Sequence, residues 1–307
     1  MHFISKYCIA FCLMIGFAFA PCSAAHAQSV TGDSSSAPRD SRSHVYNVNY
    51  WVTGGIILAG GAAGLLTIPA RAKPNFTDAE LAAVDRNNVP SYDRWSLNQN
   101  PALVPTFENY STILQYTMGA LPLALLFDDD IRKDGLDVML MGLEVNAVVI
   151  GIFTASPLGP LFETRYRPIV YYPSRIYATN QVNKTLYTNN HVDLANGNNK
   201  NSFYSGHIES AAAASFFMAK VYCDYHPDAN KYIVYSIAAI PPLVMGYVRL
   251  MALDHFPSDV AVGLGVGTLC GILIPELHKI GDKNLSMGVY SSPTGTGLEL
   301  KWDMASE

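Results

Sequence analysis

The sequence predicts an all-α fold, a six-helix bundle followed by a C-terminal β-hairpin. Half of the 307 residues are hydrophobic and only 15% are charged, well below the roughly 25% usual in soluble domains. The apolar stretches are rich in Ala, Leu, Gly, Met and Ile and lack the alternation typical of strands. Only the last part of the chain alternates polar and apolar residues. Helices are therefore expected to form the body of the protein.

Six apolar segments carry the helical pattern, and together they define a predicted helical domain over residues 50–280. In the first segment, Gly60 and Gly64 are spaced for close contact with another helix. A membrane span needs about twenty mainly apolar residues, and the first segment meets this best because polar residues interrupt the others. The predicted helices are Trp51–Ala70, Thr112–Phe127, Leu136–Gly159, Ser205–Tyr222, Tyr232–Leu253 and Asp259–Leu277.

Two shorter features flank these helices. Thr77 and Glu80 have the spacing of a capping box, which predicts a short helix over Ala79–Asp85. In the tail, residues 281–307, apolar residues alternate with polar ones on both sides of a stretch rich in Ser, Thr, Pro and Gly. This pattern predicts the β-hairpin.

The first 49 residues are typical of an export signal and a linker. Lys6 precedes an apolar stretch, and Ala25-His26-Ala27 has the small residues of a cleavage site. A signal peptide is therefore predicted over residues 1–27, with an uncleaved membrane anchor as the alternative, and a linker over residues 28–49. Cleavage would leave only Cys223 and Cys270, too few for a disulfide framework.

The charge of the chain argues against a nucleic-acid partner. Its net charge is −5, its pI is about 5.9, and no basic stripe is present. The acidic run Asp128-Asp129-Asp130 is interpreted as a charged turn between helices rather than a metal site.

The first of three polar clusters follows the third predicted helix. It contains Arg165 and Arg167, and Pro168 favours an extended conformation for the residue before it. In an extended segment, side chains two residues apart point the same way. Guanidinium groups match phosphate oxygens, so this cluster is a candidate anion site. A solvated loop is the alternative interpretation.

The second cluster begins the fourth predicted helix. Ser205 can cap that helix, and Gly206 allows a ligand to approach the backbone closely. The free N–H groups of a helix N-terminus favour anions, and His207 could donate a proton beside one. The alternative is a capped helix with an incidental histidine.

The third cluster joins the last two predicted helices. It contains Arg249, His255 and Asp259, and Pro257 suits the first helical position. We expect the Asp259 carboxylate to accept a ring N–H of His255, which would make the other ring nitrogen more nucleophilic. The alternative is a capping aspartate beside a structural histidine.

The order of the helices predicts that these clusters meet. In an up-and-down bundle, the connections after the third and fifth helices emerge at the same end. All three clusters should therefore lie together, with histidines, arginines and a carboxylate around one site.

In order and spacing, the clusters resemble the type-2 phosphatidic acid phosphatases, a family related to bacterial acid phosphatases and vanadium haloperoxidases. That family carries Lys-x6-Arg-Pro, Pro-Ser-Gly-His and Ser-Arg-x5-His-x3-Asp on a helical bundle. The resemblance covers about residues 110–278. Three positions depart from the motifs: Pro160 stands for the lysine, Tyr204 for the second motif's proline and Val248 for the third motif's serine.

The resemblance implies a phosphatase that uses neither metal nor cofactor. His255 would attack phosphorus, His207 would protonate the leaving group, and Asp259 would orient His255. The implied phosphate ligands are Arg167, Arg249, Ser205 and Gly206, with Arg165 as the candidate replacement for the missing lysine.

The expected function is dephosphorylation of an envelope lipid or a lipid-linked phosphate, via a phosphohistidine. Two alternatives stay open: a soluble periplasmic acid phosphatase, and a non-catalytic membrane protein that binds anionic head groups. The protein is expected in the cell envelope, membrane-associated, with its site outside the cytoplasm. After an exported N-terminus, an exterior site requires that an odd number of the first three helices do not cross the membrane.

Overall fold

The fold is seen in a computed structural model of the chain, which describes residues 44–155, 159–162, 164–172, 195–280, 285–292 and 295–302. The predicted signal peptide and the first part of the predicted linker, up to residue 43, lie outside these ranges. Within them the structure is all-helical except for two terminal strands.

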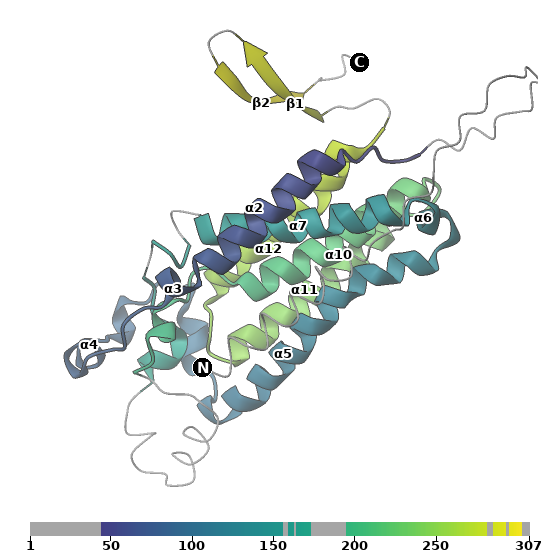
Figure 1. Cartoon of the computed structure of the whole chain (residues 1–307). Coiled ribbons are helices and arrows are strands. Elements are labelled where there is room, and N and C mark those ends of the chain that lie inside the picture. Colours follow the sequence, from purple (N-terminus) through teal and green to yellow (C-terminus); the bar gives the residue numbers. More distant parts are fainter. Residues whose placement is uncertain are drawn as a thin grey trace, which may run out of the picture. The chain divides into compact units, whose positions relative to one another are not determined.

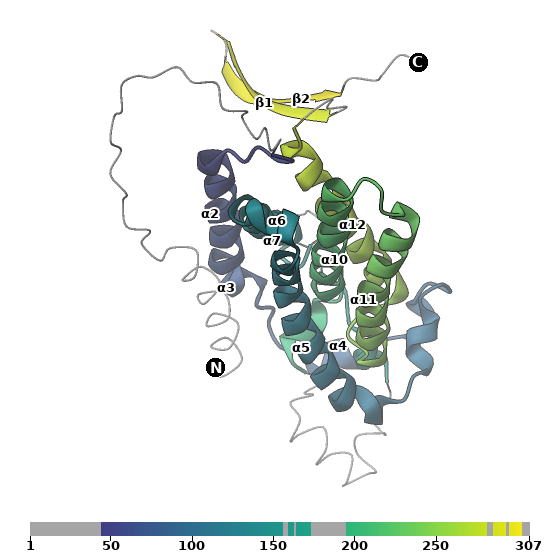
Figure 2. The same cartoon turned by 90° about the vertical axis from the view of Figure 1, so that its right-hand side faces the viewer.

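Long helices form the body and run alongside one another (Figures 1 and 2). Helix α10 is central and packs against α5, α7, α11 and α12, while α2 packs on α7. Each lies on one of the segments predicted to be helical, although the ends differ. Their bounds are α2 Tyr50–Leu66, α5 Val104–Ala120, α7 Gly135–Ala155, α10 Gly206–Tyr225, α11 Lys231–Met251 and α12 Pro257–His278.

Short elements connect the long helices. The Thr77–Glu80 capping box is present and opens α4, which ends earlier than predicted. The acidic run caps and begins α6, where Asp128 accepts hydrogen bonds from the backbone N–H groups of Asp130 and Ile131. The α-helices among these elements are α3 Ile68–Arg71, α4 Asp78–Ala82 and α6 Asp129–Lys133. The 3₁₀ helices are Arg86–Asn88, Arg94–Asn98, Pro101–Leu103, Leu121–Phe127, Pro168–Tyr171 and Gly197–Lys200.

The two strands follow α12. Strands β1 Leu285–Ser292 and β2 Gly295–Trp302 pair antiparallel, with Leu285 opposite Trp302. Among the residues that the structure describes, these two strands form one two-stranded sheet.

Helix α5 begins earlier than the sequence predicts. It starts at Val104 instead of Thr112, with a proline in its first turn. The added turns contain Glu108 and Ser111, polar residues that hide the apolar pattern. This difference matters because both face the candidate site described below.

Glycines set the distance between α10 and α12. A Cβ at Gly267 would lie 2.1 Å from the backbone oxygen of Glu209, and one at Gly263 would lie 2.5 Å from that of Ser205. Only helices that approach with their backbones in contact leave so little room. Gly60 has the same role between α2 and α7, where a Cβ would lie 2.2 Å from the backbone oxygen of Ala147.

The end of the predicted linker is part of the bundle. Tyr46 is among the most completely buried side chains, and its hydroxyl donates to Asp224 at 2.7 Å. The backbone N–H of Asn47 donates to the carbonyl of His278, and Ile280 N–H to that of Val45. The chain therefore enters and leaves the helical body at one end, the end where α12 finishes.

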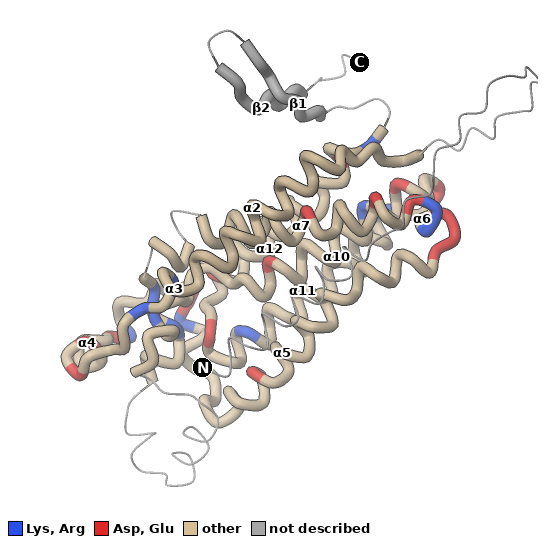
Figure 3. The backbone as a smooth tube through the Cα atoms, in the orientation of Figure 1, with Lys and Arg blue, Asp and Glu red and all other residues tan. Residues whose placement is uncertain are grey.

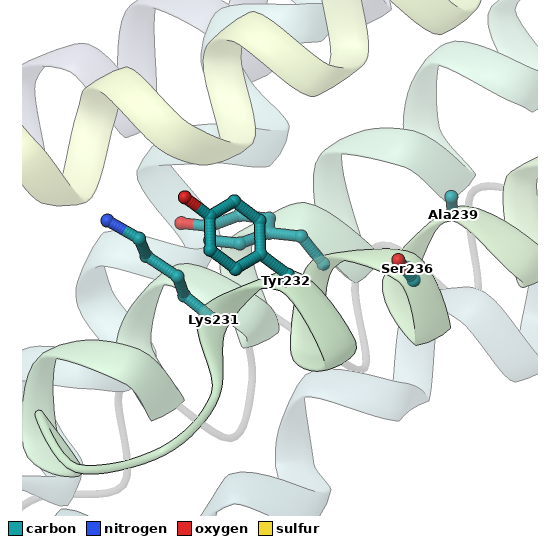
Figure 4. A pocket seen from close by; sticks show the side chains of 5 residues that line it. Lys231, Tyr232, Ser236 and Ala239 are labelled. Atoms are coloured by element: carbon teal, nitrogen blue, oxygen red, sulfur yellow. The ribbon is translucent and has the colours of Figure 1, made fainter.

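The sides of the bundle are apolar. Helices α7, α11 and α12 are long and apolar enough to cross a membrane, and α2 is a shorter apolar helix. Charged residues lie mostly near the two ends of the bundle (Figure 3). A groove at the start of α11 is lined by Lys231, Tyr232, Tyr235, Ser236 and Ala239 (Figure 4). Large exposed side chains continue along α11, namely Ile233, Ile237, Ile240, Leu243, Val244 and Tyr247.

Candidate active site

The polar clusters meet at the end of the bundle where α5, α10 and α12 begin. Charged residues gather at this end around α3 and α4 (Figure 3). The segment with Arg165 and Arg167 runs beside residues 199–202, because the Arg165 N–H donates to the carbonyl of Lys200 and the Ser202 N–H to that of Arg165. The sequence prediction that the clusters converge is therefore matched by the chain's path.

His255 is held in one orientation by the backbone. Its side chain is buried, and Nδ1 lies 2.6 Å from the carbonyl oxygen of Ser202. Because a carbonyl can only accept, Nδ1 carries the ring proton and Nε2 of the neutral ring keeps its lone pair. Burial, together with Arg249 and Arg167, lowers the pKa of His255 well below its ordinary value. The free ring is thus neutral and able to act as a nucleophile.

The Asp259 carboxylate and the His255 Nδ1 each bond to other groups, which differs from the sequence prediction. One carboxylate oxygen accepts from the Ser202 hydroxyl at 2.7 Å and from the Phe256 N–H at 2.8 Å, and the other pairs with Arg165. The reason is local: a carboxylate in the first turn of α12 reaches the free N–H groups of that turn first. Its link to His255 runs through Ser202, whose carbonyl holds the ring.

The beginning of α10 faces the same space. Ser205 is the N-cap residue, but its hydroxyl makes no capping bond, which differs from the prediction. That oxygen is buried with no protein partner. A buried hydroxyl at a helix N-terminus is well placed to donate to a bound anion.

His207 lies in the first turn of α10 beside the arginines. Burial and the charges of Arg249 and Arg167 lower the pKa of His207 well below its ordinary value. The charge of His207 in turn lowers the pKa of His255, so the two rings are electrostatic neighbours. A dianion bound between them and the arginines would favour the protonated form of His207.

Arg167 and Arg249 share one acidic partner. Arg167 pairs with Oδ1 of Asp254, and Arg249 Nη2 lies 2.5 Å from Oδ2 of the same carboxylate. Arg249 Nη1 also donates to the Ser111 hydroxyl of α5 at 2.9 Å. In each arginine the buried Nε has no protein partner. These nitrogens are donors that a phosphate oxygen could use.

Arg165 differs from the other arginines. Its Nη1 pairs with Asp259 and donates to the Ser258 hydroxyl at 2.9 Å, while Nη2 lies 2.6 Å from Asp93. Its guanidinium also stacks over the Phe256 ring, 4.7 Å from the ring centre. With both terminal nitrogens on carboxylates, Arg165 ties the start of α12 to residue 93 and is poorly placed to replace the motif lysine.

The remaining departures from the motifs are accommodated in the core. Tyr204 is buried and its hydroxyl donates to Glu209 at 2.9 Å, and Val248 is buried in α11. Lys200 is the lysine nearest along the chain to the second cluster, but its Nζ lies 2.8 Å from Glu80 and over the Phe76 ring. Its charge is thus already paired.

Several residues of this site escaped sequence reasoning. Asp93, Ser202, Asp254 and Glu108 all contact or influence predicted site residues. Asp254 directly precedes His255, a signal that could have been used. Asp93 lies in a stretch without hydrophobic periodicity, so no pattern could have pointed to it.

The fold and the site define a class of protein: an all-helical bundle in which two histidines lie beside two arginines, Arg167 and Arg249. Such a site is suited to binding an oxyanion group and transferring it. The family comparison agrees with this class. Residues 140–280 match the model of the PAP2 superfamily. This match supports a phosphatase-type function. No curated protein and no solved structure matches the chain.

Proposed function

We propose that the protein hydrolyses phosphate monoesters through a phosphohistidine formed on His255. The observation that carries this proposal is the hydrogen bond from Nδ1 to the Ser202 carbonyl, because it directs the lone pair of Nε2 away from the backbone. The surrounding arginines and His207 supply the charge and the proton that the reaction needs.

In the first step, Nε2 of His255 attacks phosphorus and the bond to the leaving oxygen breaks. His207 gives its proton to that oxygen, so an alcohol leaves. Charge develops on the equatorial oxygens, which Arg167, Arg249 and the Ser205 hydroxyl would stabilise. Asp259 acts indirectly, because it accepts hydrogen bonds from the Ser202 hydroxyl and from the Phe256 N–H at the start of α12.

In the second step, water attacks phosphorus and the bond between phosphorus and Nε2 breaks. His207, now neutral, takes a proton from the water. Inorganic phosphate leaves, and both histidines return to their starting state. The Ser202 carbonyl favours the same His255 tautomer throughout.

We propose an envelope lipid or a lipid-linked phosphate as substrate. The apolar sides of the bundle support this, because a membrane-associated enzyme meets such substrates directly. The proposed location is the cell envelope, after export by the predicted signal peptide. Comparing turnover of a lipid phosphate in detergent with that of a soluble chromogenic ester distinguishes this proposal from a non-specific acid phosphatase.

The decisive variant is His255→Ala. We expect it to abolish turnover of a chromogenic phosphate ester while the helical circular dichroism stays unchanged. Vanadate should inhibit the native protein, since it imitates the five-coordinate transition state. The matched control is His226→Ala, which removes a histidine that pairs with Asp128 at 2.9 Å. Full turnover by the His255 variant would refute the mechanism, and no turnover by the native protein would favour the non-catalytic alternative.

A further inference from the structure

Asp254 lies between Arg167 and Arg249, the two arginines that together form the arginine cradle of the candidate site. It is buried and paired with both Arg167 and Arg249, the two arginines expected to bind phosphate. An internal carboxylate therefore already neutralises part of the charge that would attract a substrate.

A second acid, Glu108, reaches the same place from α5. It lies three residues before Ser111, so both are on the face of α5 that contacts Arg249. Its carboxyl lies near that of Asp254, whose charge is the largest cause that raises the pKa of Glu108. Two carboxyl groups in such a contact can hydrogen-bond to each other only when one of them holds a proton. The contact therefore favours the protonated form of Glu108.

The charges around the pair agree with this. The charge of Asp254 and burial raise the pKa of Glu108 to about 7, while Arg249 and Arg167 act in the opposite direction. From α10 and the α11–α12 connection, His207 and His255 also face the arginines, and the pKa of each is lowered. Glu108 is therefore a group beside these arginines that titrates near neutral pH.

We propose that Glu108, beside Asp254, takes up one proton when a phosphate group binds between Arg167 and Arg249, so that Glu108 couples substrate binding to pH. The proposal rests on the phosphatase function proposed above and adds a residue that determines which charge state of the site accepts substrate.

The reason is the charge balance of the cradle. With both carboxyls ionised, two guanidinium charges meet two carboxylate charges, and nothing is left to attract an anion. One proton on the pair leaves one net positive charge. The motif lysine, absent here because Pro160 stands at its position, would make the same change of one unit. The proton thus supplies the charge that the sequence lacks.

The direction of the pH effect follows. Anion affinity should be full below the pKa of Glu108, about 7, and decline as pH rises above it. If one proton is taken up for each anion bound, the dissociation constant rises about tenfold per pH unit on the alkaline side.

Calorimetry with sulfate tests this directly. Sulfate is a tetrahedral dianion that does not titrate near neutral pH, and its binding requires no turnover. From about pH 7 to about pH 8, we expect the Kd of the native protein to rise about fivefold more than that of Glu108→Gln, in which only His207 can still take up a proton. The control is Glu276→Gln, which alters a glutamate paired with Lys220 at the other end of the bundle and should behave like the native protein.

Proton uptake gives a second measure. Titrations in buffers of different ionisation enthalpy count the protons bound with sulfate. His207 can also take up a proton, so the expected result is about one proton more in the native protein than in Glu108→Gln. Should Glu108→Gln fail to fold, binding by the native protein without proton uptake would still overturn the proposal, and uptake of more than the one proton that His207 can bind would support it.

The outcomes separate this proposal from the phosphatase function. Sulfate binding without proton uptake, in a protein that loses turnover with His255→Ala, would overturn only the proton coupling. Proton-linked sulfate binding in a protein without turnover would overturn only the catalytic proposal. Absence of sulfate binding at every pH would overturn the coupling, because the cradle would not be an anion site.

Discussion

Arg165 and Arg167 are two residues apart, yet the structure assigns them different tasks. Arg165 connects two fully buried carboxylates, Asp93 and Asp259. Arg167 points to Asp254 and keeps a buried nitrogen without a protein partner. The first arginine is therefore expected to support the fold of the site, and the second to bind the substrate.

Glutamine substitutions should separate these tasks. Arg165→Gln leaves two buried carboxylates without their cation, which typically costs about 3–5 kcal/mol of stability, so its Tm should fall clearly while the remaining folded protein binds sulfate. Arg167→Gln should weaken sulfate binding at least about tenfold, since a charge-assisted hydrogen bond is lost. Thermal unfolding and calorimetry measure both effects. Equal loss of sulfate affinity in the two variants would contradict the assignment.

At the scale of the elements, close contact between α10 and α12 builds the site. The glycines of α12 let its backbone touch that of α10, and the Ser205 N–H donates to the carbonyl of Asp259 at 3.2 Å. This contact brings the second and third clusters together. A wider separation of the helices would move the Ser205 hydroxyl, the proposed phosphate ligand, away from His255, the proposed nucleophile.

Two alanine substitutions in α12 test this contact. Gly267→Ala places a Cβ 2.1 Å from a backbone oxygen of α10, so the helices must move apart, at a typical cost of about 1–3 kcal/mol. Gly265→Ala is the matched control, because its Cβ would meet no atom within 4 Å. We expect a lower Tm and lower turnover for the first variant only. Equal Tm values would show that the contact does not constrain the bundle.

At the scale of the whole molecule, the chain alternates between two ends of the bundle. Residues 45–47 bond to residues 278–280 at one end, and the candidate site lies where α10 and α12 begin, at the other. If every long helix crossed a membrane, residue 44 and the site would lie on opposite sides. An exported N-terminus and a site outside the cytoplasm are therefore compatible only if not every long helix crosses the membrane.

Cysteine labelling distinguishes these arrangements. His44→Cys and Phe162→Cys place thiols at exposed positions near the two ends, in a background with the other cysteines replaced. For a membrane-associated protein outside the cytoplasm, a maleimide that cannot cross the cytoplasmic membrane should label both. Labelling of only one would show that the bundle crosses the membrane, and would identify which end faces outward.

The sequence by itself determined the helical class, the approximate position of each long helix and the three clusters. Hydrophobic content and motif spacing are local properties, so they can be recognised without knowing how the helices pack. The order of helices was also enough to predict that the clusters meet, because it depends only on the direction in which the chain runs. The family comparison confirms the resemblance of residues 140–280 to this superfamily.

Only the tertiary structure decided which partner each polar group takes. The sequence predicted a hydrogen bond between Asp259 and His255. In the structure the carboxylate bonds to the first turn of its own helix and to Arg165, and the His255 ring bonds to a backbone carbonyl. Asp254 and Glu108 come from different elements, and their contact depends on where α5 lies. Hydrogen bonds and ion pairs require positions accurate to a fraction of an ångström. Such positions are set by packing across the whole bundle, which no local pattern in the sequence records.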